Sequence, residues 1–365
     1  MNRVYNFGAG PAILPVAVLE EASQGVREIG GTGMSILEVS HRSKTYEAIH
    51  VDARTRILEL MGLPESDYTV LFLQGGASMQ FAMVPMNLLR QGATADYVIG
   101  GDWGAKALKE AKKVGKGAPQ EIASSKDDKY SYIPKQYNVT PGARYVHVTT
   151  NNTIEGTQWF GTPFSDGRPL VADMSSDFLS VRRDFSAYEL IYAGAQKNAG
   201  PAGVTIVVGR KSALDVAPAD LPAILSYKTY LDSDSLYNTP PVFSIYCVGL
   251  VAKWLQGEGG LEGMEAKNRA KAKVLYDALD STSEFYRPAV TAREDRSLMN
   301  VTFTLQPAYA ELEAELLAGA KEHKLDGLKG HRSVGGFRAS IYNAFPAEGV
   351  QVLANYLKEF AQAKG

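Results

Sequence analysis

The sequence predicts an α/β protein whose helices flank a mainly parallel sheet, and two observations lead to this prediction. Short apolar runs recur along the first two thirds of the chain, each followed by a glycine-rich or polar turn and most of them by a stretch with helical periodicity. Strands that are apolar along their whole length are buried on both faces, and helical crossovers between them are typical of parallel sheets. We therefore expect a large unit built on such a sheet and a smaller α/β unit after it.

Six strands and three helices can be placed by residue range. The strand pattern occurs at 68–73, 95–100, 145–150, 169–173, 190–194 and 204–209. The last two runs are so close in the chain that an antiparallel arrangement of this pair stays open. Helices are expected where apolar residues recur three and four positions apart, which they do at 49–61, 243–255 and 350–360.

A hinge is expected at 257–260, where three of four residues are glycine. We expect residues 16–258 to form the large unit, and residues 1–15 together with 259–365 to form the small one. The length of 365 residues is sufficient for two units.

Charge and cysteine content exclude several classes of protein. Lys and Arg number 38 against 40 Asp and Glu, and partners such as nucleic acid or a membrane surface require a positive surplus. Cys247 is the only cysteine, which excludes an internal disulfide and multi-thiolate metal sites, and the five histidines lack metal-binding spacing. No apolar run is long enough to span a membrane, and Gly8, Gly10 and Pro11 interrupt the start of any secretory signal. We expect a cytoplasmic protein without a bound metal.

Two ionisable residues at or just after strand ends are candidates for chemistry with a planar aldehyde cofactor. The segment 190–203 delivers Lys197 from a strand into a turn of small residues, which leaves room for Schiff-base formation with a planar aldehyde cofactor. Asp173 closes another apolar run, at the end of a strand where open α/β sheets bind ligands. A carboxylate there can keep the ring nitrogen of pyridoxal phosphate protonated. The alternatives are a solvated loop lysine and an N-cap for residues 174–176.

A glycine turn at 75–78 stands between a strand and a helix. Free N–H groups and the helix dipole favour a phosphate at such a position, and an ordinary strand–helix turn is the alternative. The chain lacks the Gly-Lys-Ser/Thr of a P-loop, and neither 8–10 nor 31–33 completes Gly-x-Gly-x-x-Gly. An ATPase or a dinucleotide-dependent enzyme is therefore disfavoured.

Aromatic, hydroxyl and basic residues complete the candidate set. Trp103 follows a strand and can stack on a planar ring, and Thr153 follows another strand end and can bond a phenolate oxygen. A core aromatic and a turn residue are the alternatives. Arginines bind carboxylates and phosphates bidentately, with surface salt bridges as the alternative. The basic candidates for a small polyanionic substrate are His41, Arg42, His331, Arg332 and Arg338.

Seven segments, taken in this order, resemble the phosphoserine aminotransferase family, whose members are class V, fold-type I enzymes dependent on pyridoxal 5′-phosphate (PLP). They are NFGAGPAILP (6–15), SILEVSHRS (35–43), FLQGGASMQFAMVPMNLL (72–89), TTNNTIEGTQ (149–158), YAGAQKNAGPAGVTIVV (192–208), LYNTPPVFSIY (236–246) and KGHRSVGGFRASIYNAFPAEGV (329–350). The resemblance runs nearly end to end, and it implies that 16–258 is the PLP-binding domain.

The resemblance implies a role toward the cofactor for each matching residue. Lys197 would bond covalently to PLP, Asp173 would pair with the pyridine nitrogen, and Trp103 would stack on the ring. Thr153 would contact the 3-hydroxyl group. The phosphate would be held by Gly76, Ala77 and Gln196 of the same subunit and by Asn238 and Thr239 of the partner subunit.

The resemblance also implies how substrate is bound. His41 and Arg42 of the partner subunit, together with His331 and Arg332, would bind the substrate's phosphate or distal carboxylate. Arg338 would bind the α-carboxylate. Ala77 stands where some family members carry an arginine, so that arginine's substrate contact is absent here and the basic pairs have to compensate.

The activity implied is ping-pong transfer of an amino group between glutamate and 3-phosphohydroxypyruvate in serine biosynthesis, by a homodimer with shared active sites. Some relatives also accept a phosphorylated hydroxythreonine of vitamin B6 synthesis. The alternatives are another class V enzyme, such as an alanine–glyoxylate aminotransferase, or a non-catalytic phosphate-binding α/β protein. A cysteine desulfurase is disfavoured, because Cys247 lies in an apolar helical stripe.

Overall fold

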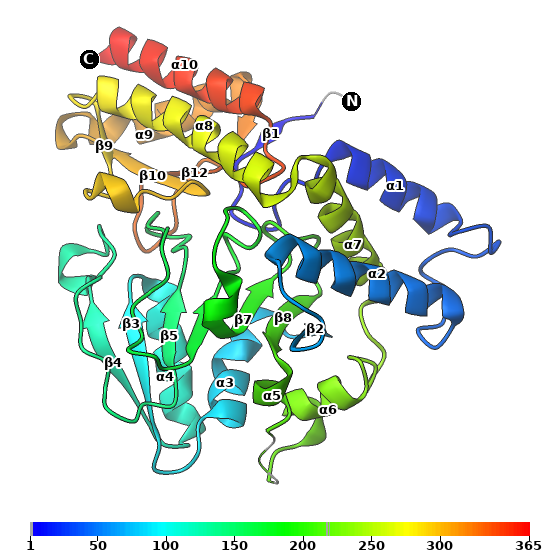
Figure 1. Ribbon diagram of the computed structural model, residues 1–365. Helices are drawn as coiled ribbons and strands as arrows, with labels where there is room; N and C mark the ends of the chain where they lie inside the picture. Colours follow the sequence, from blue (N-terminus) through cyan, green and yellow to red (C-terminus); the bar gives the residue numbers. More distant parts are fainter. Residues whose placement is uncertain (1–2, 217, 219) are drawn as a thin grey trace.

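The computed structural model describes residues 3–216, 218 and 220–365. A seven-stranded sheet forms the centre of the larger group of elements, in the lower part of Figure 1. In spatial order the strands are β2 (Tyr68–Leu73), β8 (Thr205–Arg210), β7 (Tyr188–Gly194), β6 (Leu170–Asp173), β5 (Val146–Thr149), β3 (Thr94–Ile99) and β4 (Ala118–Ser124). The pairings from β7 through β6, β5 and β3 to β4 are parallel, whereas β8 is antiparallel to both of its neighbours. The predicted α/β class with a mainly parallel sheet is confirmed, and the run at 204–209 is the antiparallel strand.

Helices cover both faces of this sheet because successive strand residues point to opposite faces. Val70 and Phe72 of β2 pack in the core that includes α1 (Val16–Arg27), α2 (Lys44–Met61) and α7 (Val242–Gly257). Leu71 and Leu73 pack in the core on the other face. The helices of that face are α3 (Gly76–Leu88), α4 (Asp102–Val114), α5 (Lys211–Leu214) and α6 (Tyr227–Asp232). The sheet is thus buried on both sides.

A second group of elements forms its own core. Antiparallel strands β9 (Tyr286–Pro288), β10 (Asn300–Leu305) and β12 (Phe337–Ser340) pack with α8 (Gly260–Ser281), α9 (Glu313–Glu322) and α10 (Ala347–Lys364). The N-terminal strand β1 (Tyr5–Asn6), which lies beside this group in Figure 1, pairs with β11 (Leu325–Asp326). Phe7 and Ile13 belong to this core. The division at 16–258 stays a prediction, which these separate cores support. Short 3-10 helices occur at Lys126–Asp128, Phe185–Ala187, Ala223–Leu225, Arg293–Asp295 and Pro307–Leu312.

Every predicted strand and helix has a counterpart in the structure, whereas one edge strand of the central sheet and the strands β9, β10 and β12 of the second core were not predicted. Helices α2, α7 and α10 lie where helices were expected, and α2 ends at Gly62, whose left-handed φ of 65° suits a glycine C-cap. Strand β4 was not predicted. It pairs only with β3, contains Pro119, and leaves most of its side chains at least partly exposed, so it lacks the apolar run of a buried strand.

A buried lysine ties the second core to the loop of Lys197. Lys271 of α8 donates to the main-chain carbonyls of Ile341, Tyr342, Asn343 and Phe345 at 2.6 to 3.4 Å. Burial lowers the pKa of Lys271 to about 7. The main-chain N–H of Asn343 in turn donates to Oδ1 of Asn198 at 2.9 Å. The segment that follows β12 is therefore fixed against the residue next to Lys197.

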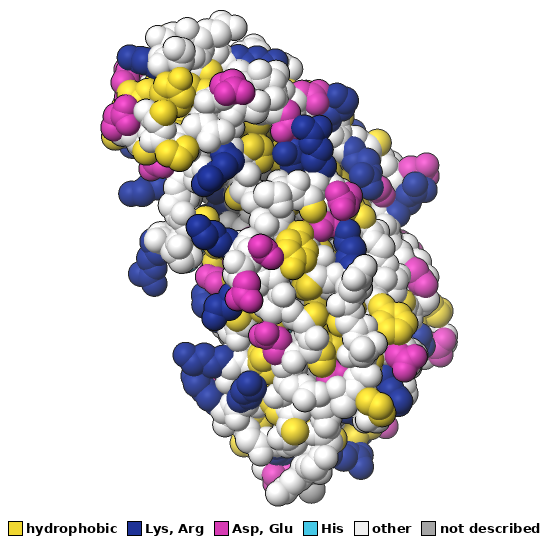
Figure 2. Space-filling model, turned by 90° about the vertical axis from the view of Figure 1, so that its left-hand side faces the viewer, with side chains coloured by type: hydrophobic (Ala, Val, Ile, Leu, Met, Phe, Trp, Pro, Cys, Tyr) yellow, Lys and Arg dark blue, Asp and Glu magenta, His cyan; other side chains and the backbone are white. Residues whose placement is uncertain are grey.

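The surface carries mixed charge. On the face that bears the outer strand β4, Lys and Arg side chains are interspersed with Asp and Glu (Figure 2). This distribution agrees with the small net charge of −2. Among the described residues, no helix is both long and apolar enough to cross a membrane.

Candidate active site

The residues expected to bind the cofactor lie where the central parallel strands end. β6 ends at Asp173, β5 leads into the turn that contains Thr153, and β7 leads into the loop of Lys197. Trp103 is the second residue of α4, which follows β3. Because the carboxyl ends of parallel strands meet at one edge of a sheet, four residues spread over 95 positions gather at one site.

Lys197 has the surroundings of a nucleophilic amine. Its Nζ donates to Oγ1 of Thr153 at 2.7 Å and lies 6.0 Å from the ring centroid of Trp103. Burial lowers the pKa of Lys197 to about 8, Asp173 opposes this shift, and Arg338 adds to it. A larger share of the amine is therefore uncharged near neutral pH than for a lysine in water.

Asp173 presents a buried carboxylate at the same strand edge. Its Oδ1 accepts hydrogen bonds from the N–H and the hydroxyl of Ser175, at 2.9 and 2.6 Å. Burial raises the pKa of Asp173, while Lys197 and the bonds from Ser175 lower it. The N-cap interpretation holds in part, because the carboxylate does cap a turn, but no helix follows. The carboxylate is thus held rigidly next to a cation.

The glycine turn opens α3 as expected for a phosphate site. Gly75 and Gly76 have φ of 88° and 69°, a left-handed conformation that only glycine adopts without strain. No side chain caps α3, and apart from the neighbouring residues and the backbone of its own helix no described atom lies within 4 Å of where a Cβ of Gly76 would stand. Ala77 follows on the helix, and Gln196 lies beside Lys197. The start of α3 therefore combines uncapped N–H groups with open space beside Gly76, and these residues fit a phosphate.

A functional residue that sequence reasoning missed is Glu155. It is buried, and its Oε1 accepts the N–H of Asp102 at 2.8 Å, at the start of the helix that carries Trp103. Burial raises the pKa of Glu155 to about 7. The available signal was an ionisable residue two positions after Thr153 in a segment that is otherwise uncharged. Glu155 fixes the helix start from which Trp103 projects.

Three basic residues border the site from the second core. Arg338 of β12 is half-buried, and its NH1 donates to the carbonyl of Thr153 at 3.5 Å. Burial lowers the pKa of His331, and the nearby cations Arg338, Lys106 and Arg332 add to this. Arg332 itself is exposed. This side of the site is therefore positively charged, as binding of an anionic substrate requires.

His41, which Arg42 follows in the sequence, lies in a surface hollow that Lys197 does not line. His41 and Thr239 line one surface hollow of about 450 Å³ together with residues 240–244. Asn238 lies close by in sequence, and its Nδ2 donates to Oε1 of Gln74 of the same chain at 3.0 Å, next to the glycine turn. Within one chain, His41 and Thr239 therefore lie in the same hollow, and Lys197 is not among the residues that line it. The roles expected for all these site residues stay predictions.

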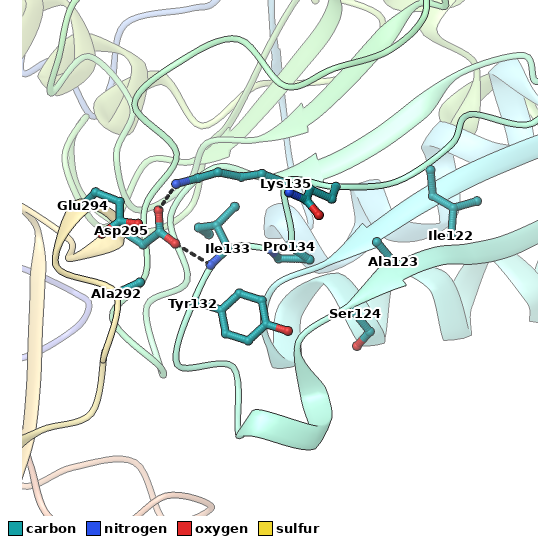
Figure 3. A pocket seen from close by; sticks show the side chains of 11 residues that line it. Ile122, Ala123, Ser124, Tyr132, Ile133, Pro134, Lys135, Ala292, Glu294 and Asp295 are labelled. Atoms are coloured by element: carbon teal, nitrogen blue, oxygen red, sulfur yellow. Dashed lines mark hydrogen bonds and ion pairs between the residues drawn. The ribbon is translucent and has the colours of Figure 1, made fainter.

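A larger hollow, of about 560 Å³, lies outside this site (Figure 3). It is lined by residues 122–124, 132–136, 292, 294 and 295, and none of the predicted site residues is among them. In Figure 3, Lys135 pairs with Asp295, whose Oδ2 also accepts the N–H of Ile133 at 2.8 Å. These contacts join the loop after β4 to the segment before β10, so we assign them a structural role.

The pKa of Lys197 gives a testable pH dependence. In the cofactor-free chain, labelling of Lys197 by an aromatic aldehyde such as salicylaldehyde, trapped with borohydride, should rise about tenfold per pH unit and level off above about pH 8. Below the pKa the ammonium has no lone pair to attack the aldehyde. Arg338→Gln should move the inflection to higher pH, because Arg338 lowers the pKa of Lys197. Mass spectrometry of the peptide quantifies the label, and an inflection above pH 10 would contradict the prediction.

Comparison with known proteins places this site in a family. The model of the family "Aminotransferase class-V" matches residues 4–353. A curated phosphoserine aminotransferase of Desulfosudis oleivorans is 55% identical over 100% of this chain and 99% of its own. Among solved structures, the phosphoserine aminotransferase of Bacillus circulans subsp. alkalophilus aligns with a TM-score of 0.96 and 48% identity, covering 100% of both chains. A PLP-bound phosphoserine aminotransferase of Trichomonas vaginalis aligns with a TM-score of 0.92 and 35% identity over 98% of this chain and 100% of its own.

These likenesses cover the whole chain, including every residue of the site described above. The chain therefore belongs to the class-V aminotransferases and, within them, to the phosphoserine aminotransferases.

Proposed function

We propose that this chain catalyses amino transfer between glutamate and 3-phosphohydroxypyruvate with PLP as cofactor, as a cytoplasmic homodimer that acts in serine biosynthesis. The observation that carries the proposal is the amine of Lys197, which donates to Thr153, lies 6.0 Å from the ring centroid of Trp103 and interacts electrostatically with the buried carboxylate of Asp173. The names of the relatives support the choice of phosphoserine as product. Two anionic substrates agree with the cationic side formed by Arg332 and Arg338, whose charges act on His331.

The residues present fit PLP. When bound, PLP supplies an aldehyde carbon that accepts the amino group and a pyridinium ring that withdraws electrons. Lys197 would bind the aldehyde carbon and, once released by substrate, move a proton between the substrate's α-carbon and the cofactor's C4′. Asp173 would hold the proton at the ring nitrogen, and Trp103 would cover the ring and exclude water.

The phosphate of PLP would be held at the start of α3. The N–H groups there would donate to it, with Gly76, Ala77 and Gln196 from the same chain. Asn238 and Thr239 would donate from the partner subunit. One observation supports the sharing of phosphate sites between subunits. His41 and Thr239 line the same surface hollow, as expected if both residues contact one partner subunit.

Substrate would be held by cations from two directions. Arg338, whose guanidinium borders Thr153, would bind the α-carboxylate that glutamate and phosphoserine share. His331 and Arg332, with His41 and Arg42 of the partner subunit, would bind the distal carboxylate or the phosphate. One set of cations then serves both substrates, because both groups are anions of similar reach.

Two measurements test the reaction. Purified protein should be yellow, and borohydride should bleach it and link the cofactor to Lys197. Phosphohydroxypyruvate should be the preferred amino acceptor over glyoxylate in a steady-state assay. A colourless protein that takes up no PLP would favour the binding-protein alternative, and a preference for glyoxylate would favour an alanine–glyoxylate aminotransferase. The same panel decides whether a phosphorylated hydroxythreonine is a second substrate.

Removal of Arg42 tests both the phosphate role and the sharing of sites. Arg42→Ala should raise the KM for phosphohydroxypyruvate about ten- to a hundredfold, because charge-assisted hydrogen bonds contribute about 1.5–3 kcal/mol, and should leave PLP affinity unchanged. Arg332→Ala should act in the same way. Lys44→Ala is the matched control, since Lys44 is exposed and its one described ion pair joins it to Glu47 on the surface.

Mixing subunits separates a shared site from a site within one chain. Arg42→Ala and Lys197→Ala chains, unfolded and refolded together, should regain activity, because the hybrid dimer contains one site without either change. No regain would show that Arg42 serves its own chain. Equal loss of PLP and substrate affinity in Arg42→Ala would instead indicate a structural role.

A further inference from the structure

The turn after α6 holds two consecutive residues in strained backbone. Asp234 and Ser235 have φ of 49° and 64°, in the left-handed region that side chains with a Cβ disfavour. Such residues persist where their surroundings fix them, and they concentrate at functional sites. The strained pair stands just before Asn238 and Thr239, so its conformation sets where these two residues lie.

Helix α2 fixes the first of the two residues. Arg54 NH1 pairs with Oδ1 of Asp234, and Arg54 NH2 pairs with Oε1 of Glu65 at 3.1 Å. Nε2 of His50 lies 3.6 Å from the same Oδ1, somewhat beyond hydrogen-bond length, and has no other partner among the described residues. His50 and Arg54 hold the pKa of Asp234 at about 2, so this carboxylate stays ionised.

His50 is itself held in place. It is 1% exposed, its Nδ1 lies 3.4 Å from the hydroxyl of Tyr46, and its ring packs edge-on against Phe72 with centroids 5.2 Å apart. Because His50 and Arg54 are four residues apart on α2, they project from one face of the helix. Asp234 is therefore bound by a rigid surface.

Strand β2 fixes the second residue. Oγ of Ser235 accepts the N–H of Phe72 at 3.0 Å, and Ser235 is buried. β2 is the outermost strand on this side and leads directly into the glycine turn. Farther along the segment, Oδ1 of Asn238 accepts the hydroxyl of Tyr230 at 3.3 Å. The strained turn thus connects α2 and β2 to the segment that contains Asn238.

We propose that Asp234 is a positioning residue: its pairing with His50 and Arg54 holds the turn at 234–235 in its left-handed form and so places Asn238 and Thr239 for the cofactor phosphate. Helix α2 also begins just after Arg42, so one helix sets the position of both groups expected to face a partner subunit. This inference rests on the proposed function, because the phosphate role of Asn238 and Thr239 is part of it.

The test compares two cofactor forms on the full-length, cofactor-free chain. Dissociation constants are measured by quenching of tryptophan fluorescence, for PLP and for pyridoxal, which lacks the phosphate. Asp234→Ala should weaken PLP binding about tenfold or more and leave pyridoxal binding unchanged. Asp234→Asn should restore part of the loss, because asparagine tolerates the left-handed region and keeps an acceptor oxygen. Asp232→Ala is the matched control, an exposed residue of α6 that pairs with Lys228.

A second set of variants keeps the inference separate from the proposed function. In an Asn238→Ala, Thr239→Ala background, Asp234→Ala should cause no further loss of PLP affinity. If that background binds PLP as tightly as the unaltered chain, the phosphate role fails and this inference fails with it. If the background weakens PLP binding but Asp234→Ala alone does not, or if Asp234→Ala weakens PLP and pyridoxal equally, this inference alone is overturned.

If Asp234→Ala does not fold, a substitution of the second residue of the same turn, Ser235, provides the test. Ser235→Ala removes the acceptor for Phe72 N–H but keeps the pairing of Asp234 with α2. It should also weaken PLP binding more than pyridoxal binding, with circular dichroism of both variants matching the unaltered chain. Equal effects on the two cofactor forms in Ser235→Ala would overturn the inference even where Asp234→Ala does not fold.

Discussion

Lys197→Ala should lower kcat for amino transfer by at least about a thousandfold. The chain would lose both the amine that binds the aldehyde carbon and the base that moves the proton, and proton transfer by a positioned side chain alone contributes about 10²- to 10⁴-fold. Steady-state kinetics with glutamate and phosphohydroxypyruvate, followed by single-turnover measurement of the first half-reaction, give the effect on chemistry apart from product release.

Two further variants make this prediction specific. Lys253→Ala should leave kcat unchanged, because Lys253 lies on the surface of α7 and pairs with Glu21. A small primary amine added to Lys197→Ala should restore part of the rate, since it replaces the missing proton acceptor. A Lys197→Ala chain with more than a tenth of the original kcat would mean that another residue carries the proton.

Asp173→Asn should lower kcat about a hundred- to a few thousandfold. Asparagine keeps the acceptor for Ser175 but removes the negative charge that would hold the ring nitrogen protonated. Removing one partner of a buried charged pair costs about 3–5 kcal/mol, which corresponds to this range of rates. The absorbance of the bound cofactor should change as well, because its ring loses a proton.

The control for Asp173 uses an exposed aspartate on the loop before β6. Asp166→Asn should change neither kcat nor the spectrum, since Asp166 is exposed and its φ of 50° suits asparagine as well. If Asp173→Asn lowers thermal stability but not kcat, the carboxylate serves only the turn at Ser175. Restoration of the rate by a cofactor analogue with a permanently charged ring nitrogen would confirm the electrostatic role.

The sequence predicted the residues that stand at strand ends. Lys197, Asp173, Thr153 and Trp103 each follow an apolar run, so a parallel sheet brings them to one edge once its class is known. Residue type and position indicated a chemical role for each with an ordinary structural alternative, and the family resemblance favoured the chemical role. Because few residues separate the β7 and β8 segments in the sequence, an antiparallel pairing was also considered, and the structure shows this pairing.

The remaining features depend on contacts that no local pattern records. The role of Glu155 depends on its hydrogen bond with the N–H of Asp102, which lies 53 positions away and begins the helix of Trp103. Asp234 pairs with Arg54 across 180 positions, and neither residue stands in a recognisable motif. Strand β4 was missed because it lies at the edge of the sheet, where most of its side chains are at least partly exposed and need not be apolar.

The arrangement of the sheet has a consequence for how such an enzyme can change. Apart from Asn238 and Thr239, which precede α7, the residues expected to bind the cofactor stand at the ends of the central strands or at the start of α3. The basic residues expected to face substrate stand on β12, on the loop before it and just before α2. Most residues expected to bind the cofactor and those expected to select the substrate therefore lie on separate segments of the chain. Grafting residues 35–43 and 329–338 from a relative with another acceptor would exchange the choice of substrate while the chemistry stays in place.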